Sequence, residues 1–482
     1  MTETSTPQPP GARLTSVVGS SGGLAAPKPQ NEVRLRAIPY GFGILIVLGA
    51  IFLALPFSHQ PGKHVSLLDA LFLSTSACCV TGLTTVNVAE TFNAFGQAVL
   101  MVLIQLGGIG IMTAGTLFLI FTGGRLSLAH EKSIEGTFGR LRMARPLDVL
   151  IYACVFVLIF ELAGMIGLFS LINQYWPDHS IGESLWQAAF HSVSAFCNAG
   201  ISILPDGLVG WREQPLLLLI IDLLVIAGGI GLLTLVNLRY FYWWRRDRRR
   251  RGHITLQTRL SVLMAVILLA VGTLATLALE WNETLDGATF GQKVSWSFFH
   301  STMTRTAGFN VVDPGAMNAA TLLITVVLMF IGGAPGSMAG GIKTVTTALL
   351  LMTTWTALKR REDLNLFGRR IPRDATAAAV MLVLLASMCI VVAVIILMIL
   401  EQNNPASHSP HRWLALVFET VSAFGTVGLS TGITPLLTAG GKVVILLVMF
   451  LGRVGPLILA VHLCKPVSAW HLRYPKESVS VG

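Results

Sequence analysis

The sequence predicts an all-α membrane protein. Four M1–pore helix–M2 repeats are expected to surround one pseudo-four-fold pore, with eight full spans and four re-entrant half-helices. The chain of 482 residues is 53% hydrophobic and only 12% charged, about half the charged share of an ordinary soluble domain. Several apolar runs reach the roughly 20 residues that cross a bilayer, and a short glycine-containing segment recurs four times between them.

Positive charge is concentrated in alternate loops. Most of the 34 Lys and Arg residues lie in the two tails and in clusters at 125–145, 245–259 and 359–373, whereas the loops between carry acids such as Glu90 and Asp178. Because an excess of Lys and Arg marks cytoplasmic loops, we expect both termini and all three clusters in the cytoplasm. A net charge of +10 arranged in this way does not indicate nucleic-acid binding.

These markers divide the chain into nine segments. They are a disordered cytoplasmic N-terminal tail (1–33), repeat 1 (34–122), a basic loop (123–146), repeat 2 (147–243), a basic loop (244–257), repeat 3 with a broken second span (258–357), a basic loop (358–374), repeat 4 (375–465) and a cytoplasmic C-terminal tail (466–482). Within each repeat the predicted order is a span, a short helix, an irregular glycine segment and a second span. Both ends of every repeat then face the cytoplasm.

The recurring segment, called the glycine segment below, has a similar form in all four repeats. The four segments are Val80, Thr81, Gly82 and Leu83; Asn198, Ala199, Gly200 and Ile201; Thr306, Ala307, Gly308 and Phe309; and Thr426, Val427, Gly428 and Leu429. A second glycine-rich marker follows each one at a nearly constant distance, beginning at Gly107, Gly228, Gly332 and Gly452. Two markers that stay in register four times indicate internal repeats.

The glycine segments are expected to bind a cation. Irregular backbone at membrane depth is tolerated only where it is buried or lines water, so the four segments should meet at one axis. Glycine permits torsions closed to other residues, so that successive carbonyls can point one way and replace the hydration shell of an ion. The half-helices direct their negative ends to the same place. Glycines that merely pack helices together would not explain the hydroxyl and amide side chains that recur there.

The second span of repeat 3 contains a run that cannot stay helical. Its small residues are Gly332, Gly333, Gly336, Ser337, Gly340 and Gly341, with a proline among them. Glycine and proline at this density break a helix, so we expect a mobile loop below the glycine segments; a kinked packing helix is the alternative. Lys343 then either pairs with loop carbonyls or reaches the cytoplasmic interface.

Arg453 stands where the repeated marker has its second glycine, deep in the last span. A charge at that depth is costly and is usually paired or functional. We expect Arg453 to oppose the loop and to form part of a barrier to cations, with pairing to backbone carbonyls as the alternative; both can hold. His191 and His300 are expected to begin their short helices and either to cap them or to make buried hydrogen bonds, with metal binding as a less favoured alternative.

With these motifs the chain resembles the Trk/Ktr/HKT superfamily of potassium transporters, and is most similar to the bacterial KtrB-type membrane subunit. The resemblance covers about residues 35–470 and rests on the four glycine segments, the run from Gly333 to Thr344 and the segment from Gly452 to Leu457. It implies that the glycine segments form a potassium filter and that the broken span is the gating loop. Glycine at all four central positions resembles the potassium-selective pattern of the family.

The same resemblance implies potassium uptake across a bacterial inner membrane by a channel-like, multi-pass protein. It implies potassium in the filter, no covalently bound cofactor, a homodimer and a cytoplasmic ring of nucleotide-binding RCK-type regulatory subunits; membrane lipids surround the protein. Sodium dependence, and a sodium- or proton-coupled symporter, stay open because a filter alone does not exclude coupling. A membrane-embedded enzyme is a remote alternative that we do not expect, since the repeats bring no acids or nucleophiles together.

Overall fold

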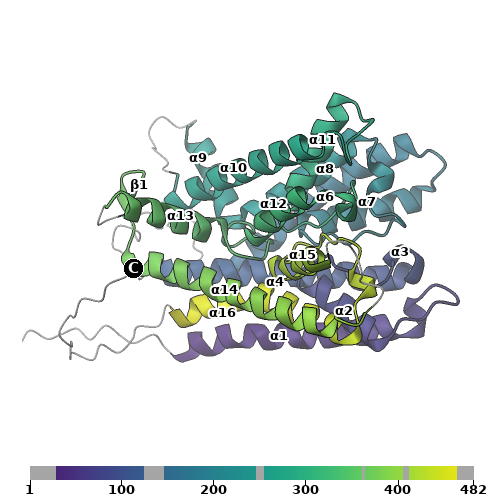
Figure 1. Cartoon of the computed structure of the whole chain (residues 1–482), viewed down its shortest axis with the longest axis horizontal. Helices are drawn as coiled ribbons and strands as arrows, with labels where there is room; N and C mark the ends of the chain where they lie inside the picture. The colour runs from purple at the N-terminus through teal and green to yellow at the C-terminus, as the bar shows by residue number, and fades with distance from the viewer. Residues whose placement is uncertain (1–28, 124–145, 246–253, 361–363, 405–411, 464–482) are drawn as a thin grey trace, which may run out of the picture.

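The computed structural model describes residues 29–123, 146–245, 254–360, 364–404 and 412–463, and helices make up most of it (Figure 1). The predicted C-terminal tail, nearly all of the predicted N-terminal tail and most of the basic loops at 123–146 and 244–257 lie outside the described residues. Helix α1 begins at Pro29, a few residues before the expected start of repeat 1. Proline suits a first helical position because it lacks the backbone N–H that would stay unpaired there.

Each repeat contains a short helix directly before its glycine segment: α2, α7, α11 or α15. Repeat 1 comprises α1 (Pro29–Ala54), α2 (Leu67–Cys78), the short α3 (Val88–Thr91) and α4 (Ala94–Gly123). Repeat 2 comprises α6 (Pro146–Tyr175), α7 (Ile181–Phe196), α8 (Pro215–Ile230) and α9 (Leu232–Arg245). Repeat 3 comprises α10 (Leu256–Leu279), α11 (Phe290–Met303), α12 (Ala319–Phe330) and α13 (Thr344–Leu358). Repeat 4 comprises α14 (Arg373–Leu400), α15 (Arg412–Gly425) and α16 (Ala439–Leu463).

Within the described residues, five helices are long and apolar enough to cross a membrane: α4, α6, α10, α14 and α16. The bent pair α8–α9 would make a sixth. Of the eight spans expected, the other two are α1, whose apolar stretch Pro39–Ala54 is shorter, and the pair α12 and α13. The break between α12 and α13 lies where the glycine-rich run predicts it, and residues 331–343 form the repeat-3 loop there.

The second span of repeat 2 differs from expectation. The apolar run 216–243 predicts one continuous helix, but α8 and α9 meet at an angle of 98°. The bend lies at Gly231, whose φ of 88° is closed to most other residues. Repeat 2 therefore contains a second broken span.

The short helices α7 and α11 begin at capping boxes. Ser180 accepts a hydrogen bond from the N–H of Glu183, whose side chain accepts one from the N–H of Ser180. Thr289 and Gln292 make the same reciprocal pair at the start of α11. Ser66 caps α2 with its side chain. These pairs satisfy orphan N–H groups, so the sequence itself fixes where the half-helices begin.

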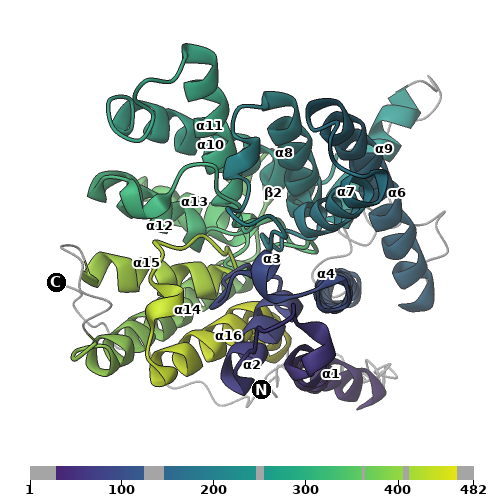
Figure 2. The same ribbon diagram turned by 90° about the vertical axis from the view of Figure 1, so that its right-hand side faces the viewer.

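Contacts between repeats follow a closed circle. The helix that begins the second span of each repeat packs on the short helix of the next: α4 on α7, α8 on α11, α12 on α15, and α16 back on α2. Figure 2 looks along the long axis and shows the loops that follow the short helices meeting near the middle of this circle. The chain thereby brings four segments that lie far apart in the sequence to one place.

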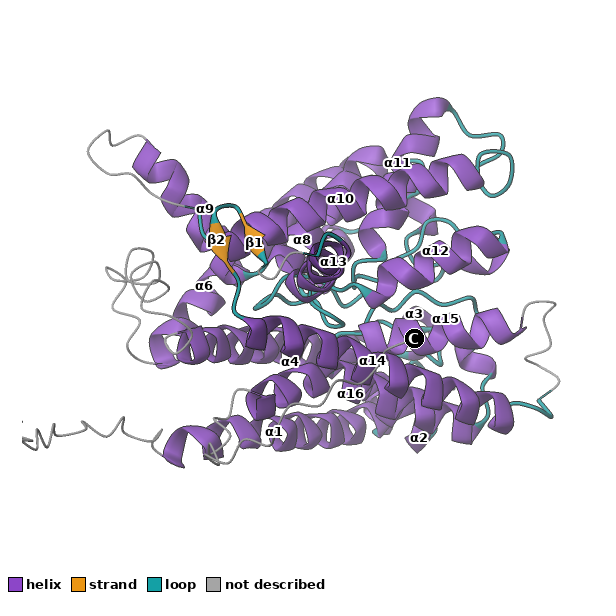
Figure 3. Cartoon of the chain, turned by 60° about the vertical axis from the view of Figure 1, so that its left-hand side comes forward, coloured by secondary structure: helices purple, strands orange, loops and turns teal. Residues whose placement is uncertain are grey.

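The outer sides of the helices carry large apolar side chains. Ile44, Ile166, Leu274 and Ile399 are each more than 60% exposed and come from four different helices. Apolar surface of this extent is typical of a face in contact with lipid. Outside the helices, β1 (Asn365–Leu366) and β2 (Arg369–Arg370) pair in a small hairpin within the predicted basic loop 358–374 (Figure 3).

Candidate functional site

The central glycines of the four glycine segments are neighbours in a closed circle. A Cβ atom added to Gly82 would lie 2.6 Å from the carbonyl oxygen of Ala199 in the next repeat. At the other three glycines the same addition would meet the corresponding carbonyl oxygen at 2.2–2.3 Å. These pairs are Gly200 with Ala307, Gly308 with Val427, and Gly428 with Thr81. No side chain fits between neighbouring segments, so glycine is required four times.

Backbone torsions alternate along each glycine segment. The central glycines have φ between 66° and 99°, and the residues two positions earlier have φ between 50° and 70°. Those earlier residues are Val80, Asn198, Thr306 and Thr426. Left-handed torsions at non-glycine residues cost about 1–3 kcal/mol each, and the surrounding structure must supply that energy. Such alternation allows successive carbonyl groups to line one side of the backbone.

Hydroxyl groups at the ends of the short helices hold the glycine segments. The hydroxyl of Ser76 accepts a hydrogen bond from the N–H of Gly82 at 3.0 Å, and that of Ser422 accepts one from Gly428 at 3.1 Å. In repeat 2 the hydroxyl of Ser194 donates to the carbonyl oxygen of Ile201 at 2.7 Å. The repeated hydroxyl position therefore has a structural reason in three repeats, whereas the corresponding Thr302 in repeat 3 donates to the carbonyl of Phe298 in its own helix.

A buried carboxylate braces the chain after the fourth glycine segment. Glu419 in α15 accepts hydrogen bonds from the hydroxyls of Ser430 and Thr434, each at 2.6 Å, and from the N–H of Thr431 at 2.9 Å. The role of Glu419 was not predicted. The sequence does contain one signal for this role. Glu419 lies nine residues before Gly428, and a histidine lies nine residues before the central glycine of repeat 2.

That histidine, His191, bonds through Nε2 to the hydroxyl of Ser202 at 2.9 Å and through Nδ1 to the carbonyl of Gln187 at 2.8 Å. In repeat 3, His300 bonds to the hydroxyl of Thr325 at 3.1 Å. Both histidines are buried, and the buried hydrogen bonds are confirmed. The expected position at the start of a short helix, and with it the capping role, is wrong, because α7 begins at Ile181 and α11 at Phe290.

All four central glycines line one cavity. Its volume is about 460 Å³, and the rest of its wall comes from the stretches that follow the glycine segments. Asn87, Asn310, Ser430 and Asp313 are among its polar lining residues. A single cavity that touches all four glycines gives an ion a shared path to their carbonyl groups.

The repeat-3 loop is held by the broken second span of repeat 2. The N–H groups of Ala334 and Met338 donate to the carbonyls of Gly229 and Gly228 at 2.9 and 3.1 Å. In return the N–H of Leu232 donates to a loop carbonyl, that of Gly336, at 3.3 Å. The bend at α8–α9 exposes helix-end carbonyls, which need partners, and the loop supplies them.

The loop closes on itself and presses against the fourth glycine segment. The N–H of Gly332 donates to Ile342 at 2.8 Å, and Thr344 donates to the carbonyl of Gly333 at 3.0 Å. A Cβ atom on Gly340 would lie 2.1 Å from the hydroxyl of Thr426. The small residues that the sequence singles out, Gly332, Gly333, Gly336, Ser337, Gly340 and Gly341, thus lie in one compact turn.

Two cations hold neighbouring carbonyls of this loop. Arg453 in α16 is 3% exposed and donates from Nη1 to the carbonyl oxygen of Met338 at 2.5 Å. Lys343 donates from Nζ to the carbonyl oxygen of Ala339 at 2.6 Å. Of the two alternatives for Lys343, the structure shows the pairing with a loop carbonyl. Positive charge therefore lies on the loop that abuts the fourth glycine segment.

Arg305 is a buried cation to which the sequence analysis assigned no role. It directly precedes the third glycine segment and donates from Nη1 to the carbonyl oxygen of Ala265 in α10 at 2.6 Å. Its own carbonyl accepts a long hydrogen bond of 3.4 Å from the amide of Asn198. The signal available was an arginine directly after a short helix that the sequence predicts to lie within the membrane. Arg305 connects the second and third glycine segments to α10.

Comparisons with known proteins find relatives among cation transport proteins. The family model described as "TrkH: Cation transport protein" matches residues 42–468. The chain is 34% identical to the potassium/sodium uptake protein NtpJ of Enterococcus hirae, over 94% of this chain and 99% of that one. It is also 34% identical to the Ktr system potassium uptake protein B of Bacillus subtilis, over 93% and 96%. The potassium transporter TrkH of Vibrio parahaemolyticus superimposes with a TM-score of 0.63 at 18% identity, over 89% of this chain and 85% of that one, and shares its fold.

Proposed function

Since the chain belongs to the TrkH family of cation transport proteins, we propose that it takes up potassium across the cell membrane along the axis of its four glycine segments. The family expected from the motifs is thus the correct one. The observation that carries the proposal is the single cavity lined by Gly82, Gly200, Gly308 and Gly428. The related Ktr protein of Bacillus subtilis is named for potassium uptake.

We propose that the glycine segments act as a potassium filter. Sixteen residues form it: Val80, Thr81, Gly82, Leu83, Asn198, Ala199, Gly200, Ile201, Thr306, Ala307, Gly308, Phe309, Thr426, Val427, Gly428 and Leu429. Their carbonyl oxygens replace the water around a potassium ion. Left-handed torsions at two positions per segment aim the carbonyls before an ion arrives, so little reorganisation is needed on binding. The helix ends of α2, α7, α11 and α15 add a favourable potential for a cation.

The repeat-3 loop and Arg453 form the proposed gate. The loop abuts Thr426 at the end of the filter, where it narrows the path. A fixed positive charge at that place raises the energy of a passing cation, because Coulomb interactions are strong where water is scarce. Opening requires the loop to leave Arg453 and the carbonyls of Gly228 and Gly229.

The finer architecture is part of the proposal. The charge pattern is explained by four pseudo-four-fold repeats with eight spans, by both termini in the cytoplasm of a bacterial cell, and by location in its inner membrane. A homodimer on a ring of RCK-type regulatory subunits follows from the resemblance. Potassium is the cargo of this transporter, and we propose neither a covalent cofactor nor an enzymatic activity.

Sodium-coupled symport is the second candidate function. It is favoured by the relative from Enterococcus hirae, whose name includes both potassium and sodium. Channel-like flux and symport differ in their response to a sodium gradient. In channel-like flux the reversal potential follows the potassium gradient alone, whereas symport shifts it when sodium is changed.

Flux through the purified chain in liposomes tests both candidates. Potassium-loaded vesicles should exchange rubidium when the protein is present, and an imposed sodium gradient should leave the rubidium distribution unchanged. Sodium-driven accumulation of rubidium would establish symport instead. A chain that passes neither potassium nor rubidium in the folded state would reject the proposed function.

A further inference from the structure

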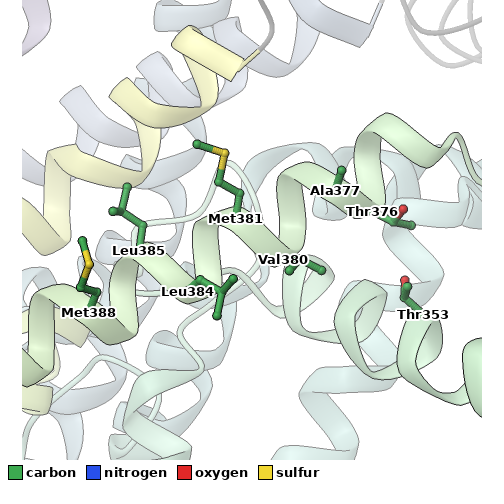
Figure 4. Close-up of a pocket in the computed structure, with 8 residues that line it drawn as sticks. All are labelled: Thr353, Thr376, Ala377, Val380, Met381, Leu384, Leu385 and Met388. Atoms are coloured by element: carbon green, nitrogen blue, oxygen red, sulfur yellow. The ribbon is translucent and has the colours of Figure 1, made fainter. Parts of the chain in front are cut away.

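An apolar groove of about 600 Å³ lies between α13 and α14. Its lining residues are Thr353, Thr376, Ala377, Val380, Met381, Leu384, Leu385 and Met388. In Figure 4 Thr353 on α13 lies across from Thr376 and Val380 on α14, and the methionine and leucine side chains continue along α14. The groove is distinct from the filter and the gate, and none of its residues takes part in either.

The groove has the length of half a bilayer. From Thr376 to Met388 it follows one face of α14, which rises about 18 Å at 1.5 Å per residue. Half of the hydrocarbon core of a membrane is about 15 Å thick. Met381, Leu384 and Met388 are 49%, 65% and 58% exposed, so the groove opens sideways on the apolar outer face. An acyl chain of one lipid leaflet matches its depth and its chemistry.

Basic side chains follow the helix that forms one wall of the groove. Lys359 and Arg360 follow directly after α13 and are exposed. The ammonium of Lys359 lies 4.6 Å from the ring centre of Trp355, which is itself 57% exposed. Tryptophan and lysine together mark the head-group level of a membrane. Positive charge therefore stands where the phosphate of a lipid would lie if its chain filled the groove.

We propose that the α13–α14 groove is a binding site for one anionic glycerophospholipid. Its acyl chain lies along Ala377, Leu384 and Met388, and its phosphate contacts Lys359 and Arg360. Two basic side chains favour a head group with a net negative charge over a zwitterionic one, whose own cation offsets the charge of the phosphate. Because α13 begins directly after Lys343 of the repeat-3 loop, the bound lipid supports the helix on which that loop ends.

Quenching of Trp355 by brominated lipids tests this site. The purified full chain is placed in nanodiscs with brominated phosphatidylglycerol or brominated phosphatidylcholine, and the signal of Trp355 is the difference between the native chain and Trp355→Phe. Phosphatidylglycerol should quench at about tenfold lower mole fraction. The double variant Lys359→Gln/Arg360→Gln should remove that preference, and Ala377→Phe should abolish saturable quenching by filling the groove.

Ile395→Phe is the matched control, because Ile395 lies on the same helix, is 52% exposed and lies outside the groove. It should leave quenching unchanged. Equal quenching by both lipids in every variant would overturn the proposal. So would a change of oligomeric state by Ala377→Phe without loss of lipid binding, because the groove would then hold a second copy of the chain. Ion flux is not measured, so the result is independent of the proposed transport function.

Discussion

The guanidinium of Arg453 donates a hydrogen bond to the carbonyl oxygen of Met338 at 2.5 Å, and so ties α16 to the loop between α12 and α13. The two residues stand in different repeats. N–H groups of the same loop also donate hydrogen bonds to the carbonyls of Gly228 and Gly229 in α8 of repeat 2. Three repeats therefore meet at one loop behind the fourth glycine segment, and movement of any of them acts on it.

Replacing Arg453 with alanine should raise rubidium flux in liposomes on the order of tenfold, which corresponds to about 1.4 kcal/mol of barrier. The substitution removes both the charge and the bond to Met338. Arg453→Lys keeps the charge but not the same bond, and should give an intermediate rate if the charge forms part of the barrier. Flux that is unchanged in Arg453→Ala would contradict the role of this residue in the gate.

Replacing Gly82 with serine should lower the preference for potassium over sodium about tenfold, or about 1.4 kcal/mol. The new Cβ would lie 2.6 Å from the carbonyl oxygen of Ala199, so the two segments must separate and the carbonyls lose their positions. Competition between rubidium and sodium measures the change. The control is Gly110→Ala, where a Cβ meets Phe42 at an ordinary 3.7 Å; equal selectivity in both variants would refute the filter.

Replacing Gly231 with alanine should disturb the gate rather than the filter. Its φ of 88° is unfavourable for alanine, and the added Cβ would lie 3.0 Å from the carbonyl oxygen of Pro335 in the repeat-3 loop. The expected result is an altered flux rate with an unchanged ratio of potassium to sodium. A loss of selectivity with normal flux would show that the bend serves the filter instead.

Replacing Glu419 with alanine should lower the free energy of unfolding of the purified chain by about 1–3 kcal/mol, mainly because the buried hydroxyl of Thr434 loses its partner, whereas Ser430 and Thr431 are only half-buried. Three groups depend on this carboxylate: Ser430, Thr431 and Thr434. Glu419→Gln keeps an acceptor oxygen and should restore part of the loss. Thermal unfolding in detergent measures both variants, and an Ala variant as stable as the native chain would show that water replaces the carboxylate.

The ion pair between Lys442 and Asp69, at 2.8 Å, joins repeat 4 to repeat 1. Both side chains are only 15–18% exposed, and we expect a coupling of up to about 1 kcal/mol in a double-mutant cycle with Asp69→Asn and Lys442→Met. The exchanged variant Asp69→Lys/Lys442→Asp should recover part of the stability lost in either single charge reversal. A coupling of zero would mean that packing of α16 on α2 closes the circle without the charges.

The same residue pattern gave different structures in two repeats. Gly107-Gly108-Ile109-Gly110 and Gly228-Gly229-Ile230-Gly231 are alike, yet α4 runs straight through the first while α8 ends at the second. The difference lies outside the pattern. In repeat 2, the repeat-3 loop donates N–H groups to the carbonyls of Gly228 and Gly229, which compensates the bonds that the bend gives up. Local sequence could not predict this, because the partner stands about a hundred residues away.

The convergence of the four glycine segments was predicted, and so was the break between α12 and α13, but the bend between α8 and α9 was not. The regular spacing of the glycines was enough to predict that Gly82 and Gly428 lie close together, because each glycine segment follows the end of its own short helix. Left-handed torsions at Val80 and Thr426 were missed, since β-branched residues carry no signal for them. Those torsions come from the tertiary structure, which over-determines the backbone there. Arg305 was missed because its partner is a backbone carbonyl, which no residue type announces.

A single polypeptide supplies all four members of the glycine circle, and the four are not identical. In an assembly of four equal subunits, every substitution would appear four times around the axis. Here one substitution alters a quarter of the ring and leaves three carbonyl contacts as they were. Asn198 can differ from Thr306, and a histidine in one short helix can do the work of a carboxylate in another. In such a protein single substitutions change the glycine circle one position at a time, whereas in a symmetric ring each substitution changes all four positions together.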